Sequence, residues 1–255
     1  MRLLLTMMTL GCLFLSCNKT QKKEDLSYTF LERNGYYIDS YNGIFIHRLN
    51  ESDAIMDGYY VISNEFGKAE EFNVDKGILN GESLAFHNNN EIYSKTNYVN
   101  GKRQGEYRSY YPSGKLQKKT FYSNDILVGP TEEFFESGQL QTLSKIEDGH
   151  IVESTSYDII GTIVSQSFEQ DNRTHQQKIQ NGKIAVEEIT SNYDDYNAIK
   201  FFDQNGDLEL FIRMKTENDD RFIIELDDKG DEIKRVNIKE NPEAALKYTS
   251  YFTRQ

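Results

Sequence analysis

The chain has 255 residues, of which 13% are aromatic, and it contains 17 Tyr and 15 Phe but no Trp and only three Pro. This composition favours β-strands over helices. The net charge of −12 is unevenly placed: residues 187–243 hold eight Lys and Arg against seventeen Asp and Glu, whereas residues 76–146 hold nine against seven. The acidic C-terminal part argues against the binding of nucleic acid or anionic lipid along its length.

The N-terminus has the features of a secretion signal. Residues 1–16 carry one charge, at Arg2, and then an apolar run that is shorter than the ~20 residues needed to span a bilayer. The sequence LFLS before Cys17 resembles a bacterial lipobox, in which the cysteine becomes the lipidated first residue of the mature protein. A signal peptide with an incidental cysteine is the alternative interpretation. We predict a signal peptide over residues 1–16, lipidation of Cys17 and attachment to the bacterial cell envelope, at the outer membrane, with the N-terminal lipid as the only membrane contact.

Residues 17–30 form the next segment. After Cys17 the sequence NKTQKKEDLS is polar, without apolar periodicity, and it predicts a flexible tether. The chain has two cysteines, and Cys12 would leave with the signal peptide. The mature chain is therefore predicted to have no disulfide, so that strand pairing and packing must hold its fold.

Glycines recur at a fixed interval through the rest of the chain. Gly77, Gly101 and Gly149 are separated by multiples of 24 residues, and Asp125 stands at the remaining position of the series. The interval continues with weaker flanks towards the C-terminus, and about eight or nine units can be counted from Gly35 onwards. Such self-similarity predicts a repeat architecture.

Each unit contains two runs of about seven to nine residues, separated by turn sequences such as PSG at residues 112–114. The second run alternates in side-chain character, as residues 116–122 do, and a period of two indicates strands. Two strands and a turn in 24 residues make one hairpin. Hairpins in series predict an all-β fold, an elongated single antiparallel meander over residues 31–240, with a length of roughly 80 Å for eight hairpins.

The sequence NGKRQGEYRSYYPSGKLQKKTFYSN, residues 100–124, resembles the MORN-variant repeat of bacterial proteins. Residues 126–148 match the pattern well, and residues 77–100 match it in part, because Asn90 replaces the turn glycine. The resemblance implies an elongated antiparallel sheet of successive hairpins. Many chains of this kind are labelled as the antitoxin component of a toxin–antitoxin system, so the resemblance also implies protein binding.

The C-terminal segment, residues 241–255, predicts a cap for this array. Asn241 is a favourable N-cap residue, Pro242 suits the first helical position, and the following EAALKY favours helix. We predict a short helix from Asn241 to Tyr251 that covers the last strands. A quasi-one-dimensional array has no deep core and needs such caps at its ends.

The sequence contains no nucleophile elbow, phosphate loop or dinucleotide fingerprint. No pair of its four histidines has metal-ligand spacing, and His87 falls in the repeat column of Tyr111 and Phe135, which favours a substituted aromatic residue over a catalyst. The sequence DQNGDLE at residues 203–209 alternates oxygen ligands as a calcium loop does. Its glycine, however, is at the fourth position and not the sixth, so we interpret it as a hairpin turn. We predict no enzymatic activity, no metal and no cofactor.

A candidate binding surface lies in the units from Gly77 to Asp148, which keep the repeat best and have a positive charge balance. Their equivalent aromatic residues either pack across strands or form a contact surface with the basic residues. Since Arg108 and Tyr110 share a strand face, we expect both to be more exposed than Tyr107 and Tyr111, and to attract an acidic partner. The predicted partner-binding patch consists of Arg103, Arg108, Tyr110 and Lys119.

These features predict a monomeric, lipid-anchored, non-catalytic envelope protein whose repeat sheet binds a partner protein. A toxin that the chain neutralises, as an antitoxin or immunity protein, is one such partner. A structural or glycan-binding envelope lipoprotein is the alternative. A protein partner predicts tight one-to-one binding, whereas a glycan predicts weak binding through stacked aromatic rings.

Overall fold

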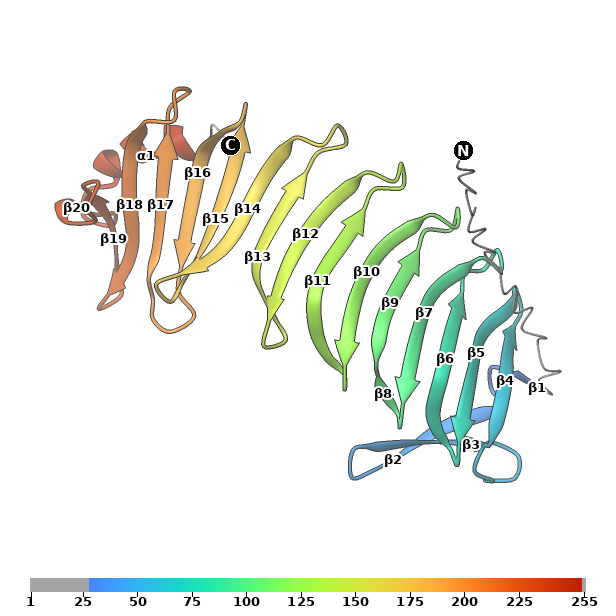
Figure 1. Cartoon of the computed structure of the whole chain (residues 1–255). Coiled ribbons are helices and arrows are strands. Elements are labelled where there is room, and N and C mark those ends of the chain that lie inside the picture. The colour runs from blue at the N-terminus through green and yellow to red at the C-terminus, as the bar shows by residue number, and fades with distance from the viewer. Residues whose placement is uncertain (1–27, 254–255) are drawn as a thin grey trace, which may run out of the picture.

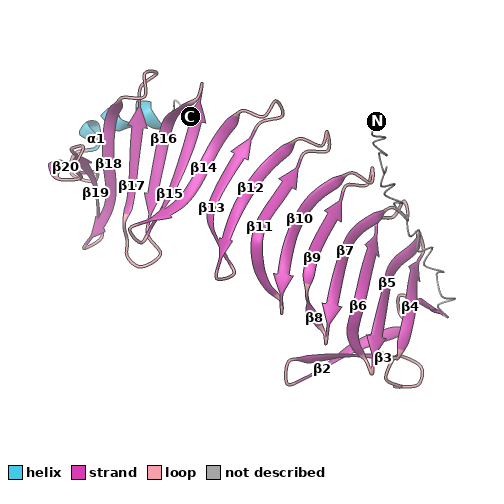
Figure 2. Ribbon diagram, viewed as in Figure 1, coloured by secondary structure: helices cyan, strands magenta, loops and turns pink. Residues whose placement is uncertain are grey.

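The computed structural model describes residues 28–253, so the predicted signal peptide, Cys17 and most of the predicted tether lie outside the described residues. Eighteen strands form one long sheet that twists along its length (Figure 1), and two further strands form a separate hairpin. The described part of the chain has one helix, α1 (Pro242–Phe252), at the C-terminal end (Figure 2). The predicted all-β, elongated fold with a short C-terminal helix is confirmed.

The long sheet is an antiparallel meander from β4 to β20. Each strand pairs with the next one along the chain, except that β8 and β9 both pair with β7. Its strands are β1 (Tyr28–Glu32), β4 (Gly58–Asn64), β5 (Gly67–Asp75), β6 (Ile78–Phe86), β7 (Ile92–Val99), β8 (Lys102–Arg103), β9 (Gly105–Tyr110), β10 (Leu116–Ser123), β11 (Ile126–Phe134), β12 (Leu140–Glu147), β13 (His150–Tyr157), β14 (Ile163–Gln170), β15 (Arg173–Gln180), β16 (Lys183–Thr190), β17 (Asn197–Phe202), β18 (Leu208–Glu217), β19 (Asp220–Leu226) and β20 (Glu232–Asn237).

From β5 to β15, two kinds of turn alternate along the chain, and this alternation produces the 24-residue interval. After β15 the order changes, because residues 181–182 also form a two-residue turn and the longer loop of residues 191–196 follows. One edge of the sheet, which we call the tight-turn edge, carries two-residue turns such as Asn100-Gly101, with φ of 51° and 80°. Positive φ at both residues is type I′ geometry, which matches the twist of paired strands. Asp125 takes the same conformation, with φ of 69°, and can therefore replace the glycine. The other edge carries longer loops, such as the one closed by Tyr111 N donating to Lys115 O at 2.8 Å.

The two faces of the sheet differ, and strand register assigns residues to them. One face is covered at its N-terminal end by the hairpin of β2 (Tyr36–Tyr41) and β3 (Ile44–Leu49), and at its C-terminal end by α1; we call it the capped face. Its two apolar clusters are Met56, Tyr60, Ile62, Phe72 and Val74 under the hairpin, and Val186, Phe201, Leu210, Ile212, Ile223 and Val236 with Tyr248 of the helix.

Between the two caps, the capped face carries small polar side chains. Thr120, Thr131 and Ser144 are buried there, and the hydroxyl oxygens of Thr120 and Thr131 lie 2.7 Å apart. The predicted absence of a deep core therefore holds for the middle of the sheet and is wrong for its two ends. The predicted helix is confirmed as a cap, and Asn241 Oδ1 accepts a hydrogen bond from Ala244 N at 3.1 Å.

The N-terminal end departs from the predicted meander in two ways. The first unit, around Gly35 and Gly43, leaves the long sheet as the β2–β3 hairpin and crosses the sheet (Figure 1). Strand β1 begins at Tyr28, inside the predicted tether, and pairs with β4 in parallel, with Tyr28 opposite Tyr59. Both departures depend on contacts between distant segments, which a repeat pattern does not contain. Within residues 28–253, no helix is both long enough and apolar enough to cross a membrane.

Candidate functional site

Three basic residues lie side by side on the face opposite the capped face. Lys95 of β7 is directly opposite Arg108 of β9, which is directly opposite Lys119 of β10. We call these three residues the cation row. Like charges in directly opposed positions destabilise a sheet, so the arrangement has a cost that packing does not explain.

Each member of the cation row has a carboxylate on the same face. Arg108 Nε lies 2.6 Å from Glu106 Oε1, Lys119 Nζ lies 3.1 Å from Glu132 Oε2, and Lys95 pairs with Glu82. The side chains of Lys95 and Arg108 are 49% and 45% exposed, and that of Lys119 is 30% exposed. The positive charge balance of residues 76–146 therefore does not come from the cation row, because its three cations are matched by three carboxylates. Such exposed ion pairs are weak, so they can be exchanged for those of a partner.

Tyr110 lies beside Arg108 as predicted, since alternate residues of a strand share a face. Hydrogen bonds to Glu106 and to the Tyr110 hydroxyl raise the pKa of Arg108. Arg108 is exposed, but Tyr110 is half-buried, as are Tyr107 and Tyr111. The expected greater exposure thus holds for the arginine, whereas Tyr110 falls in the same half-buried range as the two other tyrosines.

Arg103 does not join the other three predicted residues. It lies opposite Tyr98 on the capped face, with its guanidinium 4.0 Å from the centre of the Tyr122 ring and its Nε donating to Asp125 Oδ1 at 3.0 Å. Residues 103 and 108 are an odd number of positions apart, which places them on opposite faces of a sheet. The contacts of Arg103 join neighbouring hairpins, so we assign it to the framework of the sheet.

Sequence reasoning missed Lys95, the third member of the cation row. The 24-residue interval could have identified it, because Lys95 stands one unit before Lys119. Its strand also pairs with β9, which completes the row across three adjacent strands.

His87 has the structural role that its repeat column predicts. Its Nε2 lies 2.9 Å from the carbonyl oxygen of Tyr110, and because a carbonyl only accepts, Nε2 carries the proton. The ring also makes an edge contact with Tyr93, at 5.1 Å between centres. The imidazole is thus engaged in framework contacts.

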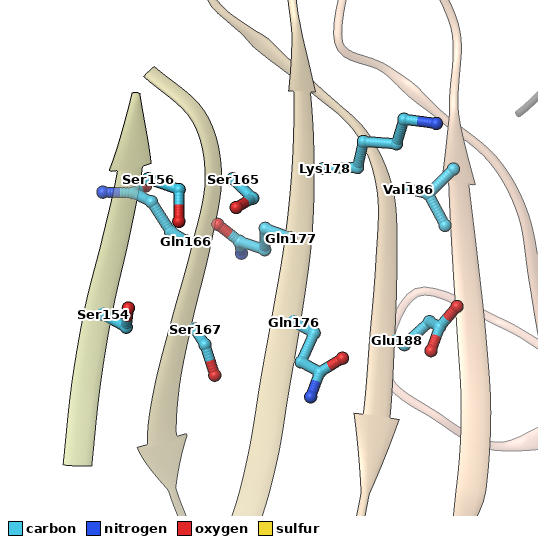
Figure 3. A pocket seen from close by; sticks show the side chains of 10 residues that line it. All are labelled: Ser154, Ser156, Ser165, Gln166, Ser167, Gln176, Gln177, Lys178, Val186 and Glu188. Atoms are coloured by element: carbon cyan, nitrogen blue, oxygen red, sulfur yellow. The ribbon is translucent and has the colours of Figure 1, made fainter. Parts of the chain in front are cut away.

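The capped face holds a groove of about 400 Å³ between β13 and β16 (Figure 3). Its lining is mostly uncharged and hydrogen-bonding, with Lys178 and Glu188 at the β15–β16 end. Ser154 also accepts from the hydroxyl of Ser144 at 3.3 Å, so part of the lining is bonded across strands. The serines that line it are Ser154, Ser156, Ser165 and Ser167. This composition suits a neutral polar ligand.

A buried carboxylate lies on the opposite face near the C-terminal end. Glu187 is 6% exposed and accepts hydrogen bonds from Gln177 Nε2 at 2.8 Å, Lys200 Nζ at 3.0 Å and His175 Nδ1 at 3.1 Å. Burial alone would raise the pKa of Glu187, but these donors outweigh it and lower the pKa. Gln177 also lines the groove of Figure 3. The groups of the cluster are nevertheless paired among themselves, as in a structural network.

The segment at residues 203–209 forms the predicted hairpin turn. Asp203 Oδ1 accepts from the backbone N–H groups of Asn205 at 2.7 Å and Asp207 at 2.8 Å, and these bonds lower the pKa of Asp203. Asp227 accepts from Lys229 and Asp231 in the same way, one repeat later. Among residues 28–253, no group of three His, Cys, Asp or Glu side chains is placed to hold a metal ion.

Comparison with known proteins supports the repeat assignment. A family model described as the MORN repeat variant matches residues 79–100 and 103–124. The chain therefore contains MORN-variant repeats, and the two matched segments hold the whole cation row. No curated protein matches the chain.

Proposed function

We propose that the chain is a lipid-anchored, non-catalytic protein of the bacterial envelope whose cation row binds an acidic segment of a partner protein. The observation that carries this proposal is the direct opposition of Lys95, Arg108 and Lys119 on three adjacent strands. Directly opposed like charges weaken a sheet, so their presence indicates that the function of the protein requires them. Arginine and tyrosine are also the residues that most often anchor protein interfaces.

The strand spacing defines the partner segment. Adjacent strands lie about 4.8 Å apart, so the three cations are spaced along a line that crosses the strands. A partner segment with carboxylates at similar intervals would replace Glu82, Glu106 and Glu132 as counter-ions. A toxin neutralised by this chain is the partner that the resemblance to antitoxin components favours.

Photo-crosslinking tests this proposal, with a photoreactive phenylalanine analogue at position 110 in cells that produce the whole chain. Position 107 is the matched control, because Tyr107 is also half-buried on the same strand but belongs to the capped face. We expect one defined protein to crosslink from position 110 and not from position 107. Equal crosslinking from both positions, or none from position 110, would contradict the proposal.

A second candidate function is supported by the groove in Figure 3. Its uncharged hydroxyl and amide lining suits a neutral glycan of the envelope. A glycan-binding lipoprotein would lose its ligand when Ser154 and Ser167 are replaced by Leu, while Arg108→Ala would have no effect. Binding of isolated envelope glycan to these variants, measured by calorimetry, separates the two functions.

A further inference from the structure

The tip of the β2–β3 hairpin is an uncharged, apolar projection. Residues 40–47, SYNGIFIH, contain no acidic or basic residue other than His47. Large apolar side chains of the tip are exposed where a folded monomer usually buries them. They are Tyr41 at 71%, Ile44 at 50% and Phe45 at 61%. The nearest charged residues, Asp39 and Arg48, flank the tip and pair with each other at 3.6 Å.

The base of the hairpin is fixed to the sheet, and its tip is not. His47 N donates to Gly77 O at 2.8 Å, and Tyr36 and Leu49 pack against the N-terminal apolar cluster. Asn42 and Gly43 form the turn, with φ of 50° and 77°. At ~3.4 Å per residue, the turn lies roughly 14 Å beyond the anchoring residue His47.

The hairpin and the start of β1 lie at the same edge of the sheet. Gly77, which anchors the hairpin, belongs to a two-residue turn of the tight-turn edge. Tyr28 pairs with Tyr59, and Tyr59 directly follows Gly58, which pairs with Val74 close to that turn. Strand β1 therefore begins at the edge where the hairpin lies.

The covalent distance to the predicted anchor sets how far this edge can be from a membrane. Eleven residue steps separate Cys17 from Tyr28. A fully extended chain covers at most ~3.5 Å per step, so the lipid holds Tyr28 within roughly 38 Å of the bilayer.

From these observations we infer that the tip of the β2–β3 hairpin inserts into the lipid bilayer and holds the tight-turn edge against the membrane. This inference rests on the proposed lipid anchor. Tyrosine and apolar residues occupy the interface between headgroups and acyl chains, and their insertion needs no basic residue. Insertion of this kind is compatible with a chain of net charge −12, which an anionic surface would repel.

Single-tryptophan fluorescence tests the inference without background, because the chain contains no Trp. The mature chain, from Cys17 onwards, carries Tyr41→Trp and is coupled through the Cys17 thiol to a maleimide-phosphatidylethanolamine in phosphatidylcholine vesicles. The control is Ile160→Trp, since Ile160 is 83% exposed at a loop on the other edge of the sheet. We expect the emission of Tyr41→Trp to shift to shorter wavelength and to be quenched by brominated acyl chains, with neither change for Ile160→Trp.

Chemical coupling makes this test independent of the proposed lipidation, because it attaches the chain to the vesicles whether or not cells acylate Cys17. Solvent-exposed, unquenched emission from Tyr41→Trp on the vesicles would overturn the inference and leave the lipid anchor intact. If the emission of Tyr41→Trp shifts with protein concentration in the absence of vesicles, the tip contacts a second copy of the chain. This result would also overturn the inference.

Partitioning of the uncoupled chain gives a second measurement. In the Cys17→Ser background, replacement of both Tyr41 and Phe45 by Ser should lower binding to the same vesicles by at least about tenfold. Salt should have little effect on the binding, because no ion pair contributes. Far-UV circular dichroism verifies that these exposed substitutions leave the sheet folded. Unchanged partitioning of the folded double variant would contradict insertion of the tip.

Discussion

Tyr111 donates a hydrogen bond from its hydroxyl to the backbone carbonyl of Phe134 at 2.8 Å, and so joins one repeat to the next. His87, 24 residues earlier, makes the equivalent contact to the carbonyl of Tyr110. Two different side chains thus serve one repeat position. The position holds the array together and leaves the neighbouring residue, Tyr110, to face the other side.

Tyr111→Phe should destabilise the protein by about 1–2 kcal/mol, because it leaves the half-buried Phe134 carbonyl without this donor. Chemical denaturation measures the change. Tyr193→Phe is the control, since Tyr193 is 82% exposed and its hydroxyl is not needed for the fold. Equal effects of the two substitutions would contradict the role assigned to Tyr111.

Glu187 predicts a pH dependence of stability. Its folded pKa is lowered, so its stabilising contribution is present above the ordinary glutamate pKa of about 4.3 and is lost as the pH falls through the folded value. Glu187→Gln should cost about 2 kcal/mol of unfolding free energy at pH 7, and the difference from wild type should shrink below pH ~4. Glu188→Gln, an exposed neighbour on the other face, should change neither value. A cost for Glu187→Gln that is the same at pH 7 and pH 3 would contradict this assignment.

Cys17→Ser should abolish lipidation and release the chain from membranes into the soluble fraction, because acylation requires a thiol. Fractionation and labelling with a radioactive fatty acid measure the two effects. Wild-type lipid labelling of the serine variant would show that Cys17 is not the acylation site.

Tyr110→Ala should weaken partner binding by about 2 kcal/mol, as the loss of a central aromatic anchor does. Folding should be largely intact, since Tyr110 is only half-buried. Titration calorimetry with the crosslinked partner measures the affinity. If Arg108→Ala combined with Tyr110→Ala leaves the affinity unchanged, the cation row is not the contact surface.

Features that repeat every 24 residues were predictable from the sequence. Gly101 and Asp125 occupy equivalent turns with positive φ, and the helix after Asn241 follows from its capping residue. These features depend on the conformational preferences of residues that are close together in the chain. A single sequence is enough to predict such preferences.

Features that depend on distant contacts were not predictable. The parallel pairing of Tyr28 with Tyr59 and the departure of the β2–β3 hairpin require partners that no local pattern specifies. The two-residue period of a strand predicts that Arg103 and Arg108 lie on opposite faces of the sheet. Charge and closeness in sequence alone place them in one patch. The 24-residue interval also predicts that Lys95 is equivalent to Lys119. Only the register of β7 with β9, however, shows that Lys95 lies directly opposite Arg108.

The affinity of the partner for a charge-matched pair of triple variants tests the central proposal most directly. One variant replaces Lys95, Arg108 and Lys119 by Ala, and the control replaces Lys102, Lys115 and Lys178, three exposed lysines outside the cation row. Both lose three positive charges, so a general electrostatic effect would be equal in the two. The proposal predicts a loss of at least about 30-fold, or ~2 kcal/mol, for the first variant and less than about threefold for the control. Equal affinities of the two variants would contradict it.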